Sequence, residues 1–233
     1  SGYFMSFDTK KINAESMSNI AEKSAEIQQT VPAFYNIQIS SLYNSQLKYS
    51  PYFDAFKNKY GYMPVAGKND GKQNNMNLES FKSLAAEISC FSDKATVGLS
   101  AWGEPLLNGE FISFVEEVLK YENLSVLIET DGLLVTEESA AAVKNAAEKA
   151  GSRKDGQSAI NWIVKLDAFT PQKYAVMHGI ESGSEEKFTA AKNAVALLEK
   201  YFTGCVYPEM LRVNENEDEL ENGLAVLENE SWV

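Results

Sequence analysis

The sequence is poor in the side chains that most often bind metals. It contains two cysteines and one histidine among 233 residues. Cys90 closes a predicted helix, Cys205 opens a predicted strand, and neither belongs to a metal-ligand spacing. The pattern predicts two buried, reduced thiols in a cytosolic protein. His178 stands alone past a predicted helix, and we expect it to be either structural or solvent-facing.

Long apolar runs and basic residues are scarce as well. No apolar run approaches the roughly 20 residues of a membrane helix, and no signal-peptide pattern occurs at the start. The 21 basic against 33 acidic residues give a formal net charge of −12, which argues against a nucleic-acid binder. We expect a cytoplasmic protein that binds neither membranes nor nucleic acids. The opening Ser1-Gly2, without an initiator Met, predicts a domain excised from a longer protein.

What the sequence does contain is a regular alternation of predicted strands and helices. The strands are predicted at 35–41, 95–101, 124–130, 160–167 and 205–213. Helices are predicted at 52–59, 78–91, 109–121, 137–150 and 184–201, with a short one from Pro171 and an acidic one from about 216. Asn77 and Thr136 are the expected N-caps of two of them. The alternation predicts an α/β domain with right-handed βαβ crossovers and a parallel sheet.

The chain is expected to divide into two parts. A helix at 14–29 with Asn13 as its N-cap forms an N-terminal helical lead-in at 1–33, and residues 34–233 form the α/β domain. An irregular stretch at 42–76 includes the Gly/Asn/Lys-rich run "AGKNDGKQNN". Loops of that length are usually functional or disordered.

Four of the predicted strands carry carboxylates, an arginine and a large aromatic residue at or just past their carboxyl ends. Because the carboxyl ends of parallel strands point to one side of a sheet, we expect these residues around one mouth. They are Trp102, Gly103, Glu104, Pro105, Glu129, Thr130, Asp131, Gly132, Asp167, Arg212 and Asn214. Simpler interpretations stay open: satisfied polar groups at strand ends, a turn at Asp131-Gly132, and a plug formed by Trp102. Otherwise Trp102, Asp131 and Asp167 should line the principal cavity.

Several stretches resemble radical S-adenosylmethionine (radical SAM) enzymes. "LSAWGEPLLNGEFISFVEEVLKYENLSVLIETDGLLVTEE", with its Gly-Glu-Pro after the second strand, is similar to the middle of such an enzyme. "MNLESFKSLAAEI", "VKLDAFTPQKYAVMHGI" and "MLRVNENEDELE" are similar to its first core helix, fourth strand and fifth strand. The resemblance covers roughly residues 34–228 and is strongest to the spirochaete spiro-SPASM proteins. It implies an incomplete parallel (β/α) TIM-like barrel of five to six strands, with a last strand starting near Trp232.

The resemblance also implies a residual S-adenosylmethionine-type site. In the family the Gly-Glu-Pro segment meets the methionine amino group, and a Thr-Asn-Gly-like turn ends the third strand. The corresponding cofactor-binding residues here are Gly103, Glu104, Pro105, Thr130, Asp131, Asp167 and Arg212. Asp131 departs from the family's asparagine.

The loop after the first strand departs further from the family. There Cys-x3-Cys-x2-Cys binds a 4Fe-4S cluster, with Asn after the first cysteine and Pro after the last. Asn44 and Pro51 keep their places, but the three ligand positions are Tyr43, Leu47 and Ser50. Iron–sulfur clusters require thiolates, with histidine an occasional substitute. We therefore expect no 4Fe-4S cluster in this chain, weak or absent S-adenosylmethionine binding, no metal ligands and no catalytic residues for radical chemistry.

Two functions follow from the resemblance. The first is a degenerate, non-catalytic domain that serves as a scaffold or ligand-binding module and contacts other domains of a longer protein. The alternative is a non-radical enzyme that binds S-adenosylmethionine or another small molecule through Glu104, Asp131, Asp167 and Arg212. A carboxylate-rich mouth could also hold Mg²⁺, although no spacing fixes that geometry.

Overall fold

A computed structural model of the chain describes residues 32–67, 74–219 and 223. The chain divides into two units, Ser1–Pro32 and Ala33–Val233, and the account below concerns the second. The predicted helix at 14–29 with its cap Asn13 lies outside the described residues. So do nearly all of the lead-in at 1–33, part of the Gly/Asn/Lys-rich run, and the strand predicted near Trp232.

The second unit is built on a five-stranded parallel sheet. The strands are β1 (Phe34–Asn36), β2 (Ala95–Gly98), β3 (Leu124–Thr130), β4 (Ile160–Lys165) and β5 (Val206–Glu209), in the spatial order β1-β2-β3-β4-β5. Each neighbouring pair is parallel, with Val97 opposite Val126 and Ile163 opposite Tyr207. The predicted incomplete, parallel α/β architecture is confirmed.

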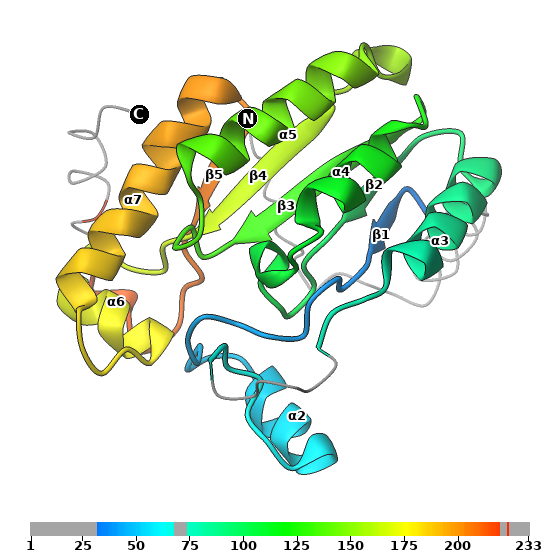
Figure 1. Cartoon of the computed structure of the whole chain (residues 1–233). Coiled ribbons are helices and arrows are strands. Elements are labelled where there is room, and N and C mark those ends of the chain that lie inside the picture. Colours follow the sequence, from blue (N-terminus) through cyan, green and yellow to red (C-terminus); the bar gives the residue numbers. More distant parts are fainter. Residues whose placement is uncertain (1–31, 68–73, 220–222, 224–233) are drawn as a thin grey trace, which may run out of the picture. The chain divides into compact units, whose positions relative to one another are not determined.

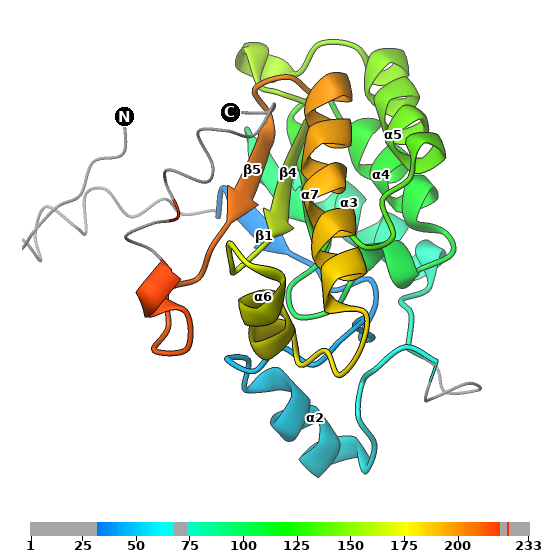
Figure 2. The ribbon, with the colours of Figure 1, turned by 90° about the vertical axis from the view of Figure 1, so that its left-hand side faces the viewer.

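The larger helices cover one face of this sheet. They are α3 (Leu78–Phe91), α4 (Phe111–Leu119), α5 (Glu137–Ala150) and α7 (Ser184–Tyr201), which lie in front of the strands in Figure 1 and to one side of them in Figure 2. Two others, α2 (Tyr52–Tyr60) and α6 (Pro171–His178), lie at the end of the sheet to which the strand arrows point (Figure 2). Short 3-10 turns occur at Pro105–Leu107 (η2), Lys154–Gly156 (η3) and Glu217–Glu219 (η4).

Local sequence explains where the helices begin. The Asn77 side chain accepts hydrogen bonds from the backbone N–H groups of Glu79 and Ser80, and Thr136 forms a capping box with Ser139. Both satisfy donors that have no partner inside the helix. These caps explain the starts of α3 and α5, and the predicted boundaries of α3, α5 and α7 are confirmed.

The core fills the space between the helices and the helix-facing side of the sheet. Val97, Val126, Ile128 and Trp162 are fully buried there, because alternate strand residues point to the same face. Burial of such a side chain contributes about 1.5–3 kcal/mol. Among the described residues, every helix is too short or too polar to cross a bilayer.

The prediction that both cysteines are buried is wrong. Cys90 is exposed and Cys205 is partly exposed. The buried stripe of α3 runs through Phe81, Ala85 and Ile88, and Cys90 lies two residues past Ile88, away from that stripe.

Candidate functional site

Three buried carboxylates gather at the rim, the edge of the sheet formed by the carboxyl ends of the strands. Glu104 follows β2, Asp131 follows β3 and Asp167 follows β4, and all three residues are fully buried. The Thr130 hydroxyl donates to the Glu104 carboxylate at 3.0 Å, and the Asp131 N–H donates to Glu104 Oε2 at 3.0 Å. The structure therefore joins Glu104, Thr130 and Asp131 in one hydrogen-bonded group.

The first loop, residues 43–50, supplies partners for two of these carboxylates. Asn44 Nδ2 donates to both oxygens of Asp131, at 3.0 and 2.9 Å, and the Tyr49 hydroxyl donates to Asp167 Oδ2 at 2.7 Å. Tyr43 and Leu47 are buried in a small apolar cluster with Phe53. The first loop thus covers the rim with its own side chains.

The backbone before the first loop approaches the rim closely as well. A Cβ atom at Gly103 would lie 1.7 Å from the Ser40 carbonyl oxygen, a distance that only glycine permits. The Glu104 N–H donates to the Leu42 carbonyl at 2.7 Å. Gly103 is therefore required here for packing.

Asp167 is held by several parts of the chain. It adopts φ of 55°, a left-handed conformation that Asp tolerates better than most residues. Its Oδ1 accepts from the Leu211 N–H at 2.9 Å, and its carbonyl accepts from Asn216 Nδ2 at 2.8 Å. These bonds tie the segment after β5 to the end of β4.

Several buried polar atoms of the first loop and of α6 have no hydrogen-bond partner among the described protein atoms. They are Tyr43 Oη, Ser45 Oγ, Tyr174 Oη and both ring nitrogens of His178. The His178 ring stacks on Tyr174 with centroids 4.0 Å apart, and its Nε2 lies 3.5 Å from Asp167 Oδ2. His178 is fully buried, so its solvent-facing interpretation is wrong.

Burial also changes the acidity of the site. It raises the pKa of Glu104 well above its ordinary value, and the nearby Asp131 charge raises it further. Burial raises the pKa of Asp131 too, although the Asn44 hydrogen bond opposes this. The pKa of Tyr49 is raised by burial and by the Asp167 charge, so its hydroxyl keeps its proton and acts as a donor.

The first loop does not offer the ligands of an iron–sulfur cluster. Tyr43 and Leu47 are buried among apolar groups, and Ser50 Oγ accepts from the Tyr52 N–H at 3.3 Å. Cys90 ends α3 and Cys205 precedes β5, so both lie toward the opposite end of the sheet. The part of the chain that the structure describes holds no group of three His, Cys, Asp or Glu side chains suited to a metal ion.

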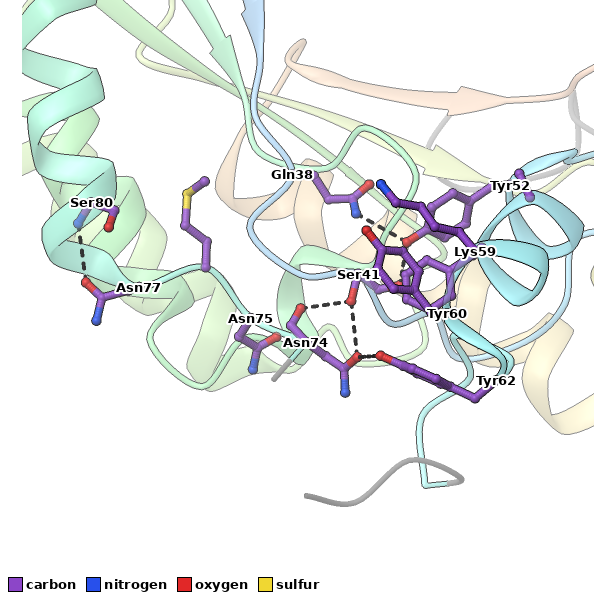
Figure 3. Close-up of a pocket in the computed structure, with 13 residues that line it drawn as sticks. Gln38, Ser41, Tyr52, Lys59, Tyr60, Tyr62, Asn74, Asn75, Asn77 and Ser80 are labelled. Carbon is purple, nitrogen blue, oxygen red and sulfur yellow. Dashed lines mark hydrogen bonds between the residues drawn. The ribbon is translucent and has the colours of Figure 1, made fainter. Parts of the chain in front are cut away.

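Other residues predicted for the mouth lie apart from the buried carboxylates. Trp102 is 52% exposed and stacks on Tyr52, so it does not plug the mouth. Arg212 and Asn214 are exposed, and Arg212 forms an ion pair with Glu217. Glu129 pairs with Lys165 on the face of the sheet opposite to the larger helices. A cavity of about 740 Å³ (Figure 3) is lined by none of Trp102, Asp131 and Asp167, contrary to expectation.

Sequence reasoning missed three residues that shape the rim. Tyr49, Tyr174 and Asn216 reach Asp167 or the His178 ring from separate parts of the chain. The clustering of tyrosines in the first loop and in α2 was a visible signal, but their partners depend on tertiary contacts.

Comparison with solved structures shows which proteins have a similar fold. The chain matches anSMEcpe with bound AdoMet at a TM-score of 0.58 and 14% identity, covering 84% of this chain and 47% of that one. It matches HydG, a maturase of the [FeFe]-hydrogenase, at a TM-score of 0.50 and 12% identity, covering 87% and 41%. The fold is of the radical SAM type. At these identities the likeness concerns the fold alone.

Sequence comparison gives a relative without an assigned role. An uncharacterized protein of Treponema pallidum (strain Nichols) is 32% identical over 212 residues, covering 90% of this chain and 55% of that protein. The chain thus spans about half the length of this curated relative. No family model matches the chain.

Proposed function

We propose that this radical SAM-type domain binds no iron–sulfur cluster and serves as a non-catalytic scaffold or ligand-binding module within a longer protein. The observation that carries the proposal is the first loop. Its ligand positions are Tyr43, Leu47 and Ser50, none of which can replace a cluster thiolate. Without the cluster, the electron for reductive cleavage of S-adenosylmethionine has no route.

The hydrogen bonds of the rim support the same proposal. Asp131 and Asp167 already bind Asn44 and Tyr49, so a ligand at the rim would have to displace the chain's own donors. Displacement leaves a buried carboxylate short of a partner unless the ligand replaces each bond. Because its own side chains already bind the rim carboxylates, we infer that the domain acts through surfaces that contact partners. The longer relative fits a role beside further domains.

A non-radical enzyme is the second candidate, because of the unpaired polar atoms. Tyr174, His178 and Tyr43 would gain partners if the first loop moved and a small polar ligand entered. S-adenosylmethionine is one such ligand. Mg²⁺ has less support, since Asn44 and Tyr49 already occupy the carboxylates.

Anaerobic reconstitution with iron and sulfide tests the first proposal. We expect no cluster absorption and no retained sulfide after gel filtration. Iron held only by the two thiols would be lost in the Cys90→Ser/Cys205→Ser double variant, which serves as the control. Stoichiometric iron and sulfide in both proteins would overturn the proposal.

A further inference from the structure

A cavity separate from the buried carboxylates lies beside α2. The cavity of about 740 Å³ opens between α2, the segment that leads into α3, and the residues after β1 (Figure 3). Its volume falls within the roughly 300–1,000 Å³ of small-molecule sites. None of the buried carboxylates of the rim, Glu104, Asp131 and Asp167, is among its described lining residues. Ligand binding in this cavity therefore does not depend on the function proposed above.

The charge of this cavity differs from that of the chain. No Asp or Glu occurs among its described lining residues, although the chain carries a formal net charge of −12. Lys59 is the one cation among them, and its Nζ lies 5.0 Å from the Tyr60 ring centroid. Among the described lining residues a cationic ligand would find no counter-charge, and a multiply anionic ligand would meet a single ammonium.

Neutral groups that both donate and accept hydrogen bonds dominate the walls. Besides three tyrosines, they are Gln38, Ser41, Asn74, Asn75, Asn77 and Ser80. Amides and hydroxyls of this kind match ligand hydroxyl groups, which also donate and accept. A purely apolar ligand would offer these groups no further hydrogen bond.

Aromatic rings provide the remaining wall. Phe56 packs against Tyr52, Tyr60 and Tyr62 with ring centroids 5.5, 4.5 and 5.2 Å apart. Tyr60 is 52% exposed, so part of its ring is open to a ligand. Aromatic side chains that combine an apolar face with a polar tip suit ligands that have both kinds of surface.

Hydrogen bonds between the walls hold the cavity in shape. Gln38 Nε2 donates to the Tyr52 hydroxyl at 3.2 Å, and that hydroxyl donates to the Ser41 carbonyl at 2.8 Å. The Tyr62 hydroxyl and Ser41 Oγ donate to Asn74 Oδ1 at 2.9 and 3.3 Å (Figure 3). Preorganised walls reduce the entropy lost on binding.

We propose that this cavity binds an uncharged, hydroxyl-rich ligand of the sugar class. The aromatic rings would contact the C–H face of the sugar, and the amide and hydroxyl side chains would bind its hydroxyl groups. The ligand is either a free sugar or a unit of a glycan chain, which present the same chemistry to the cavity.

Isothermal titration of the full chain with maltose, cellobiose and N,N′-diacetylchitobiose tests the proposal. We expect at least one to bind, with affinity about tenfold lower in Tyr60→Ala and in Asn75→Ala. Tyr207→Ala is the matched control, since Tyr207 is also 52% exposed but lies on β5, and it should bind like the parent. Both substituted cavity residues are exposed, so the variants should fold.

Further probes separate the sources and the charge. If maltotetraose binds more tightly than maltose, the site takes a glycan chain, and equal affinity indicates a free sugar; both results support the proposal. Glucosamine should bind more weakly than glucose, because no described lining residue carries a negative charge. The proposal is overturned if none of the neutral sugars binds, if glucosamine binds as tightly as glucose, or if Tyr60→Ala leaves affinity unchanged. It is overturned equally if the cavity proves to be covered by a second copy of the chain, seen as a dimer that Tyr60→Ala dissociates.

Discussion

The first loop and the segment after β2 both lie at the rim but differ in how far their sequences resemble the radical SAM pattern. The segment after β2 keeps Gly103, Glu104 and Pro105, and Glu104 is joined to Thr130 at the end of β3. The first loop has the resembling Asn44 and Pro51, but Tyr43, Leu47 and Ser50 stand where the resemblance predicts cluster ligands. The segment after β2 thus resembles the pattern more closely, whereas Asn44 and Tyr49 of the first loop donate to Asp131 and Asp167.

The residues that resemble the radical SAM pattern each make structural contacts within this chain. Glu104 accepts hydrogen bonds from the Leu106 and Asp131 N–H groups and so joins the segment after β2 to the end of β3. Gly103 lets the Ser40 carbonyl oxygen approach closely, and Asn44 Nδ2 donates a hydrogen bond to Asp131. Each interaction stabilises the fold without a ligand. Motif residues alone therefore do not establish cofactor binding in this chain.

The largest expected effect comes from Gly103→Ala. The added methyl would lie 1.7 Å from the Ser40 carbonyl oxygen, which belongs to the backbone and cannot rotate away. We expect a loss of about 2–3 kcal/mol or more in the free energy of unfolding, measured by denaturant titration. Gly109→Ala is the control, because nothing lies within 4 Å of the added Cβ. Equal stability of the two variants would contradict the close contact between the rim and Ser40.

A smaller effect is expected from Tyr49→Phe. The substitution removes the donor to Asp167 Oδ2 and leaves one bond fewer on a buried carboxylate. We expect a loss of about 1.5–3 kcal/mol in the free energy of unfolding. Tyr207→Phe should change stability by less than about 0.5 kcal/mol, since Tyr207 is exposed and its hydroxyl bond is 3.4 Å long. Similar losses of unfolding free energy in the two variants would mean that the Tyr49–Asp167 hydrogen bond does not stabilise the first loop.

The next effect concerns pH. Because the pKa of Glu104 is raised above its ordinary 4.5, the folded protein holds this proton at pH values where the unfolded chain has lost it. Its contribution is therefore fully present below pH 4.5 and is lost as pH rises toward the folded pKa. Glu104→Gln should make the free energy of unfolding fall less steeply above that pH, as measured by denaturant titrations at several pH values. A slope equal to that of the parent would show that Glu104 does not titrate abnormally.

The local parts of the fold were predictable from sequence. Asn77 and Thr136 mark helix starts through bonds to residues two or three positions away, and α3, α5 and α7 follow their apolar periodicity. The strand ends were predicted less well. The first was expected at 35–41 and the fifth at 205–213, but β1 and β5 are shorter. Apolar patterning continues beyond the residues that pair, and only neighbouring strands decide where pairing stops.

The candidate site was predictable only in part. The order of the strands is enough to place Glu104, Asp131 and Asp167 at one rim, because parallel strands end on the same side. The burial of His178 and the bond from Tyr49 to Asp167 join residues far apart in sequence, and no local pattern encodes them. Arg212 was expected at the mouth because β5 was predicted too long.

The smallest expected effect is in the titration with S-adenosylmethionine. Glu104 is already bonded within the chain, Arg212 pairs with Glu217, and entry of the cofactor would break the bonds of Asn44 and Tyr49. Each charge-assisted hydrogen bond contributes about 1.5–3 kcal/mol to binding. Association itself costs about 4–15 kcal/mol in lost translational and rotational freedom. We therefore expect a dissociation constant above about 100 μM, or no measurable heat. The Asn44→Ala/Tyr49→Phe double variant sharpens the test, because weakening the first loop should increase affinity if that loop is the obstacle. A low-micromolar dissociation constant in the parent, lost in Glu104→Ala, would instead show that the rim is an open cofactor site and would favour the enzyme candidate.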